Sequence, residues 1–185
     1  MARPYISAVT GGMDEEPLGA VRIAAPSHGD RPVSRTGGGG GARTNPHNVL
    51  LVEDNAADVF LVRQAISSYE LGVQLQTLKD GEEAIRWFDR MDVDPSITCP
   101  ELVLLDLNLP KSSGEEVLAH IRRSKRGAQV PVLIVTSSDS QRERAATRRL
   151  GVVGYFRKPS NYDLFLKLGE LIRDVLAGGR GDPPR

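Results

Sequence analysis

Five short aliphatic runs alternate with segments of helical periodicity along most of this chain. Three of the runs are almost unbroken, which is typical of strands covered on both faces of a parallel sheet. They occupy residues 48–52, 101–105 and 130–135. The run at 73–78 alternates polar and apolar residues, and the run at 152–156 is short and soon followed by Pro159. We expect these two weaker runs at the sheet edges.

Five helical patterns lie between and after the runs. They span residues 57–69, 81–91, a segment beginning after Ser112-Ser113-Gly114, 140–150, and a segment beginning near Ser160. Strands and helices that alternate in this way need right-handed crossover connections, which build a parallel sheet. We therefore predict an α/β fold with a doubly wound five-stranded parallel sheet. Its order is 2-1-3-4-5, the flavodoxin-like three-layer sandwich.

Glycine and proline divide the chain near residue 47. The first 47 residues contain 14 of them, whereas the remaining 138 contain 17. A segment of this composition buries too little apolar surface to offset the entropy of ordering it. We predict a disordered extension at 1–47, one folded domain at 48–177, and a flexible tail at 178–185.

The charge balance excludes several classes of partner. Lys plus Arg and Asp plus Glu both total 24, so no bulk field draws the chain to nucleic acid or to an anionic membrane. Cys99 is the single cysteine, which excludes an internal disulfide, and no secretory signal or membrane-spanning apolar run is recognisable. We expect a cytoplasmic protein that contacts neither nucleic acid nor membrane.

Polar side chains follow the predicted strands where each strand ends. Glu53 and Asp54 follow the first run, Asp106 the second of the unbroken runs, and Thr136 and Lys158 the last two runs. In a doubly wound sheet, ligands bind at the carboxyl ends of the strands where the strand order reverses. Three carboxylates at this place repel one another unless a cation intervenes, and oxygen ligands of this type favour Mg²⁺. Lys158 and Thr136 could hold the oxygens of a phosphoryl group bound to Asp106.

This ordered set of motifs resembles the receiver domains of two-component response regulators over residues 48–176. The matching segments are LLVEDN at 50–55, LLDLNLP at 104–110, IVTS at 134–137 and YFRKP at 155–159. Three further segments, NAAD at 55–58, NLPK at 108–111 and YFRKPS at 155–160, look most like the stand-alone receivers that pair with phytochrome-type kinases.

The resemblance implies that Asp106 is the phosphoacceptor. It implies that Glu53 and Asp54 hold Mg²⁺ together with Asp106, and that the backbone carbonyl of Asn108 completes the protein ligands. The phosphoryl group would come from the phosphohistidine of a partner sensor histidine kinase. Phosphorylation and dephosphorylation would be catalysed by the receiver itself, which makes the protein a switch and not a turnover enzyme.

Three residues have implied roles in transmitting the signal. Thr136 would move to the phosphoryl oxygen, Lys158 would pair with it, and Tyr155 would change rotamer. The surface of the fourth helix, fifth strand and fifth helix would then change. Because no further domain is recognisable after residue 177, we expect the signal to act in trans on an effector protein, on a phosphorelay histidine or through a homodimer.

Two alternative functions share the sheet order or a strand-end aspartate. A flavodoxin-like FMN electron carrier needs a phosphate-binding first loop, which Glu53 and Asp54 would repel. An aspartyl-phosphate phosphohydrolase needs a second carboxylate where this chain has Asn108.

Simpler structural roles also explain single residues. Asn55 could cap the first helix, and Asp58 near its start complements the helix dipole. The arginines of the fourth helix could form a solvated face or a partner contact.

Overall fold

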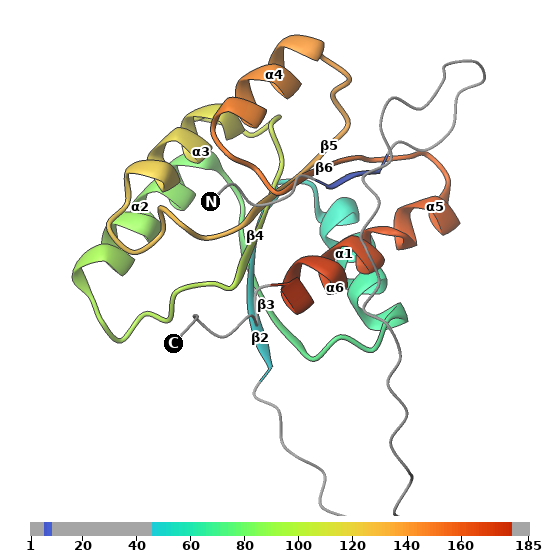
Figure 1. Cartoon of the computed structure of the whole chain (residues 1–185), viewed down its shortest axis with the longest axis horizontal. Coiled ribbons are helices and arrows are strands. Elements are labelled where there is room, and N and C mark those ends of the chain that lie inside the picture. Colours follow the sequence, from blue (N-terminus) through green and yellow to red (C-terminus); the bar gives the residue numbers. More distant parts are fainter. Residues whose placement is uncertain (1–5, 9–45, 179–185) are drawn as a thin grey trace, which may run out of the picture. The chain divides into compact units, whose positions relative to one another are not determined.

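The computed structural model describes residues 6–8 and 46–178, and these residues form six strands and six helices (Figure 1). The elements are, in chain order, β1 (Ile6–Ala8), β2 (His47–Val52), α1 (Ala56–Ser68), β3 (Val73–Leu78), α2 (Gly81–Val93), β4 (Leu102–Leu105), α3 (Gly114–Arg123), β5 (Val132–Thr136), α4 (Gln141–Arg149), β6 (Gly154–Arg157), α5 (Tyr162–Leu166) and α6 (Leu168–Gly178). The predicted extension and tail lie outside the described residues, except for residues 6–8, 46–47 and 178.

The strands of the sheet are all parallel, in the order β1-β6-β5-β4-β2-β3. Apart from β1, this is the predicted order 2-1-3-4-5, so the predicted fold class is confirmed. The three nearly unbroken runs form β2, β4 and β5 in the middle of the sheet. All residues of β4 and β5 are buried because helices cover both of their faces.

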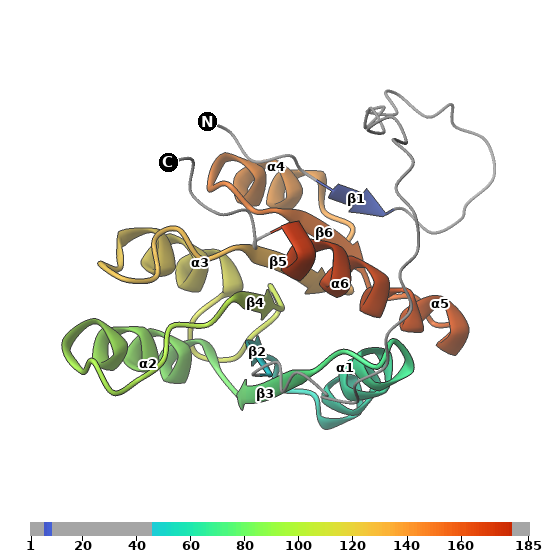
Figure 2. The same ribbon diagram turned by 60° about the horizontal axis from the view of Figure 1, so that its bottom comes forward.

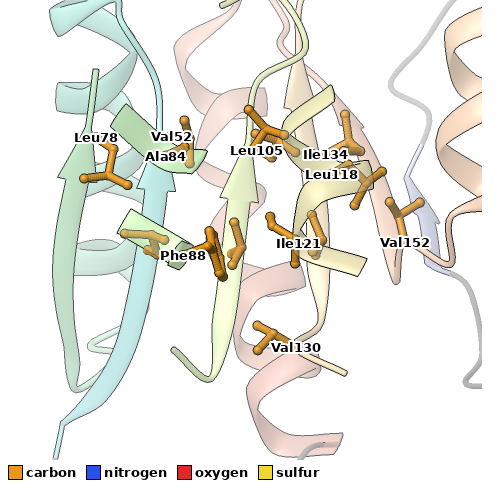
Figure 3. Packing of buried hydrophobic residues seen from close by; sticks show 14 of the residues in the cluster. Val52, Leu78, Ala84, Phe88, Leu105, Leu118, Ile121, Val130, Ile134 and Val152 are labelled. Atoms are coloured by element: carbon orange, nitrogen blue, oxygen red, sulfur yellow. The ribbon is translucent and has the colours of Figure 1, made fainter. Parts of the chain in front are cut away.

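Helices lie on both faces of the sheet (Figures 1 and 2). On one face, Phe88 of α2 and Leu118 of α3 pack with Leu105 and Ile134 of the sheet, as Figure 3 shows. On the other face, Val62 of α1 and residues of α5 and α6 form a second apolar cluster. Each fully buried Leu or Phe contributes about 1.5–3 kcal/mol. The two apolar layers therefore hold the strand ends at one edge of a rigid sheet.

The strand β1 lies within the range expected to be a disordered extension. It pairs with β6 in a parallel register that joins Ile6 to Gly154 and Ala8 to Phe156. The strand β6 is expected at the edge of the sheet, but it has a neighbour on each side in the described structure. The other expected edge strand, β3, does lie at an edge.

The predicted fifth helix is divided into α5 and α6. Lys167 N donates a hydrogen bond to Leu164 O at 3.3 Å. This bond spans three residues, as in a 3₁₀ turn, which is tighter than an α-helical turn and separates the two helices. The helix expected to begin near Ser160 begins at Tyr162. Asn161 is the cap, because its side-chain oxygen accepts a hydrogen bond from Leu164 N at 3.0 Å.

Tight packing at Gly114 fixes the start of α3 against the end of β4. A Cβ atom at this position would lie 2.2 Å from the backbone oxygen of Asp106, so only glycine allows this approach. Ser113 caps α3, and its side chain and that of Glu116 form a reciprocal capping box. The segment that carries Asp106 is thus held by α3 as well as by the sheet.

Candidate functional site

The site begins where β2 and β4 end side by side. Val52 is the register partner of Leu105, and Asp106 N donates a hydrogen bond to Val52 O at 3.1 Å. The next residues, Glu53 and Asp106, are therefore neighbours and both are buried, with 1% and 4% of their surface exposed. The prediction that the strand ends bring carboxylates together holds for this pair.

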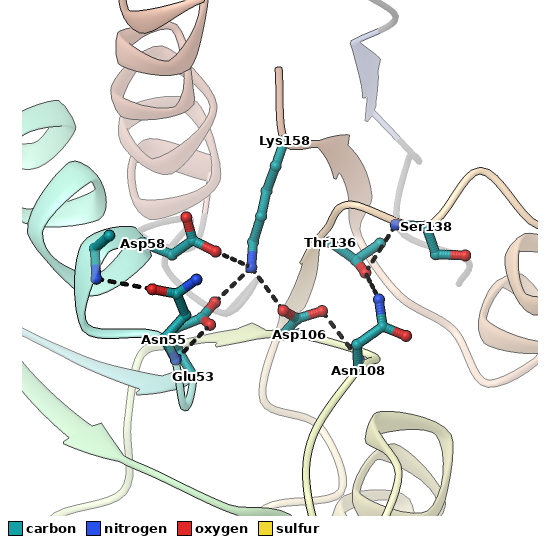
Figure 4. Close-up of polar contacts among 9 residues, drawn as sticks. Glu53, Asn55, Asp58, Asp106, Asn108, Thr136, Ser138 and Lys158 are labelled. Atoms are coloured by element: carbon teal, nitrogen blue, oxygen red, sulfur yellow. Dashed lines mark hydrogen bonds and ion pairs between the residues drawn. The ribbon is translucent and has the colours of Figure 1, made fainter. Parts of the chain in front are cut away.

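Lys158 places its ammonium group among three carboxylates (Figure 4). Its Nζ lies 2.6 Å from Glu53 Oε2, 2.6 Å from Asp106 Oδ2 and 2.8 Å from Asp58 Oδ2. The lysine side chain is only 7% exposed. Carboxylates from two segments of the chain, the β2–α1 connection and the end of β4, thus meet at the Lys158 nitrogen, and Lys158 lies next to Asp106 as expected.

Burial and hydrogen bonding have opposite effects on the pKa values of Lys158 and Glu53. For Lys158, burial lowers the pKa of the ammonium group, but the bonds to Asp106, Asp58 and Glu53 outweigh burial and raise its pKa. For Glu53, burial is the larger influence and raises the pKa of the carboxyl group, although Lys158 acts to lower it. Lys158 therefore remains a cation over the physiological range.

A chain of hydrogen bonds leads from Asp106 to Tyr155. Asn108 N donates to Asp106 Oδ1 at 3.0 Å, and Asn108 Nδ2 reaches Thr136 Oγ1 at 3.5 Å. Ser138 N donates to Thr136 Oγ1 at 3.3 Å, and the Tyr155 hydroxyl donates to Ser138 O at 3.0 Å. Figure 4 shows the part of this chain from Asp106 to Ser138. The five residues form a continuous polar path from one strand end to another.

Tyr155 is buried beneath α4. The residue is 1% exposed, and the Arg144 guanidinium lies 4.6 Å from the centroid of its ring in a cation–π contact. One of the four arginines of α4 therefore packs on the expected switch residue, whereas Arg142, Arg148 and Arg149 are exposed.

The third carboxylate at Lys158 is Asp58, and not Asp54, which is exposed. Sequence reasoning assigned Asp58 only to the helix dipole. Its position in the first turn of α1, shortly after the cap Asn55, was the signal that could have located it. Asn55 does cap α1, accepting from Ala57 N at 2.9 Å, and its own N donates to Glu53 Oε1 at 3.1 Å. The capping and functional interpretations of this loop are compatible.

The charges of these side chains suit a divalent metal ion. Three carboxylates surround one ammonium group, which leaves an excess of two negative charges when all four groups are ionised. In the described part of the chain, no three His, Cys, Asp or Glu side chains are arranged to hold a metal alone. The excess negative charge fits a hard divalent ion that keeps several waters and takes few protein oxygens.

Comparison with known proteins assigns the family. A family model described as "Response regulator receiver domain" matches residues 49–168. The chain therefore belongs to the response regulator receiver family. Receivers of this family take a phosphoryl group from a histidine kinase, bind a divalent metal in the active site and act on a downstream effector. They are phosphoacceptor switches of two-component systems, so neither the electron carrier nor the phosphohydrolase is supported.

Individual relatives cover most of the described residues. The probable methanogenesis regulatory protein FilR2 of Methanothrix harundinacea is 32% identical over 75% of this chain and 89% of its own length. The response regulator Rcp1 of Synechocystis is 36% identical over 65% of this chain and 82% of its own length.

Solved structures agree with this assignment. The phosphorylated cyanobacterial phytochrome response regulator RcpA has a TM-score of 0.66 at 29% identity, covering 75% of this chain and 99% of RcpA. The Mn²⁺-bound form of Rcp1 has a TM-score of 0.65 at 32% identity, covering 75% of this chain and 100% of Rcp1. Among the described residues, no helix is both long and apolar enough to span a bilayer.

Proposed function

We propose that Asp106 is the phosphoacceptor of this receiver and that Lys158 is its principal cationic partner. In the transfer, a carboxylate oxygen of Asp106 forms a bond to phosphorus while the bond from phosphorus to the kinase histidine nitrogen breaks. The electron pair of that bond stays on the nitrogen. The contact of 2.6 Å between Lys158 Nζ and Asp106 Oδ2 is the observation that carries this proposal.

Electrostatics support separate roles for Lys158 and Thr136 in binding the phosphoryl oxygens. The ammonium group is nearly fully buried beside the nucleophile, where low dielectric strengthens its attraction for developing negative charge. The hydroxyl of Thr136 lies close to the loop that carries Asp106, because Asn108 of that loop donates to Thr136 Oγ1. Lys158 would neutralise a transferring oxygen and Thr136 would donate to another.

Magnesium is the metal that we propose for this site. Glu53, Asp54, Asp106 and the backbone carbonyl of Asn108 would hold it, and hard oxygen ligands of this kind favour Mg²⁺ over softer metals. The ion would supply positive charge to the phosphoryl oxygens. With these groups the receiver would catalyse its own phosphorylation and dephosphorylation.

The polar path to Tyr155 supports a role in output. Ser138 N donates to Thr136 Oγ1, so a phosphoryl group that draws Thr136 toward Asp106 would disturb this hydrogen bond. The change would reach Tyr155, because the Tyr155 hydroxyl donates to Ser138 O. Movement of Tyr155 would alter the surface of α4, β6 and α5. That surface would act on an effector, on a phosphorelay histidine or on a second copy of the chain.

The proposed kinase is of the phytochrome type and the proposed compartment is the cytoplasm. The similarity to Rcp1 and to RcpA, which is described as a phytochrome response regulator, supports the kinase assignment.

Intact mass after incubation with Mg²⁺ and acetyl phosphate tests the proposal. We expect one added phosphoryl group on the full chain, and its loss on Asp106→Asn or on chelation of the metal. Asp89→Asn, an exposed aspartate of α2 that contacts His120, is the matched control and should be modified like the wild type. An unmodified wild type, or undiminished modification of Asp106→Asn, would contradict the assignment.

A further inference from the structure

Asp58 contributes a contact that the proposed reaction does not use directly. Its Oδ2 lies 2.8 Å from Lys158 Nζ, it is 22% exposed, and it comes from α1 and not from a strand end. An ammonium group has three N–H donors, and here each has one carboxylate partner. Two of those partners, Glu53 and Asp58, undergo no covalent change in the proposed reaction.

We propose that Asp58 is a positioning residue that, together with Glu53, holds the Lys158 ammonium in place so that its third N–H points at the phosphoacceptor. The inference rests on the proposed function and names a residue that acts on the same site. Lysine has a flexible four-carbon side chain, and a single contact would leave its ammonium free to turn. Two fixed carboxylate acceptors orient the ammonium group before the phosphodonor binds.

The two anchors are held to each other by the loop between them. Asn55 N donates to Glu53 Oε1, and Asn55 Oδ1 accepts from Ala57 N in the first turn of α1. Asp58 follows in that turn. The distance between the two acceptors is therefore set by the cap of α1, and the ammonium group fits between them.

The role of Asp58 predicts a specific kinetic signature. Asp58→Asn keeps the shape of the side chain but removes its charge, so we expect the maximal rate of phosphorylation by acetyl phosphate to fall about tenfold. The half-saturating concentration of the anionic donor should not rise, because one negative charge near the site is lost. Asp89→Asn, the same substitution far from Lys158, should leave both quantities unchanged.

Two further measurements separate positioning from a structural role. In a Lys158→Met background, Asp58→Asn should cause no further loss of rate, because Asp58 acts through the lysine. Without any phosphodonor, an amine-reactive reagent should label Lys158 several times faster in Asp58→Asn than in the wild type, as quantified by peptide mass mapping. Asp89→Asn should label at the wild-type rate.

Several outcomes would overturn the inference. They are an unchanged maximal rate in Asp58→Asn, an equal loss in the wild-type and Lys158→Met backgrounds, or unchanged labelling of Lys158. A wild type that takes up no phosphoryl group would instead reject the proposed function, and the role of Asp58 with it. The labelling result is obtained without phosphorylation, so the two failures are distinguishable.

Discussion

Lys158 illustrates how single residues acquire their properties from their surroundings. Its side chain is 7% exposed and yet its ammonium group remains charged, because three carboxylates offset the cost of removing it from water. Glu53 shows the reverse balance, since its burial outweighs the contact with the same lysine and raises its pKa. The two groups differ because Lys158 has three charged partners, whereas Glu53 shares its one cation with two other carboxylates.

The raised pKa of Glu53 predicts a pH-dependent contribution to stability. The folded state binds this proton more tightly than the unfolded state, whose pKa is 4.5. Its stabilising contribution is thus complete below that pH and is lost as the pH rises through the raised folded pKa. Glu53→Gln cannot titrate, so the wild type should lose stability relative to the variant over this rise.

Urea unfolding at a series of pH values measures this difference. Glu82→Gln, which replaces an exposed carboxylate on α2, is the control and should follow the wild-type profile. Parallel profiles of the wild type and Glu53→Gln would show that the buried carboxyl group does not titrate differently in the two states.

At the scale of elements, the packing of α3 against the end of β4 holds the loop that carries Asp106, the proposed phosphoacceptor. The contact at Gly114 involves backbone atoms on both sides, so it cannot be relieved by a change of rotamer. Gly114→Ala should lower the free energy of unfolding by about 1–3 kcal/mol, the usual cost of forced overpacking.

Gly72→Ala is the matched control for this substitution, since nothing lies within 4 Å of an added Cβ there. It should be neutral or slightly stabilising. Both variants can be compared by chemical unfolding, and equal stability of Gly114→Ala and the wild type would mean that α3 can move away from β4 at little cost.

Periodicity predicted most elements because strand and helix patterns are local. It placed β2, β3, β4 and β5 and the first four helices within a few residues. It missed β1, because three residues in a glycine-rich and proline-rich segment carry no usable period and their partner begins at Gly154. It missed Asp58 as a site residue because its contact depends on how α1 is oriented relative to Lys158, which no local pattern encodes.

At the scale of the whole molecule, the sheet joins segments from opposite ends of the chain. The pairing of β1 with β6 covers the outer backbone edge of the strand that carries Tyr155. Deleting residues 1–10 would expose that edge to water. We expect amide hydrogens of Gly154–Arg157 to exchange about tenfold faster in the deletion variant.

Hydrogen exchange followed by mass spectrometry tests this pairing. Deletion of residues 21–30, which removes the same number of residues and keeps β1, serves as the control. Unchanged exchange of β6 after deletion of residues 1–10 would show that β1 does not protect this strand in solution.

The convergence on Lys158 also bears on the order of events during synthesis. The lysine lies 52 residues after Asp106 and 105 residues after Glu53. At about 5–20 residues per second, the ribosome therefore makes Asp106 several seconds before Lys158. Until β6 has docked, the acidic groups repel one another without their lysine. The complete set of contacts at Lys158 therefore forms only after β6, the last strand in the chain, has joined the sheet.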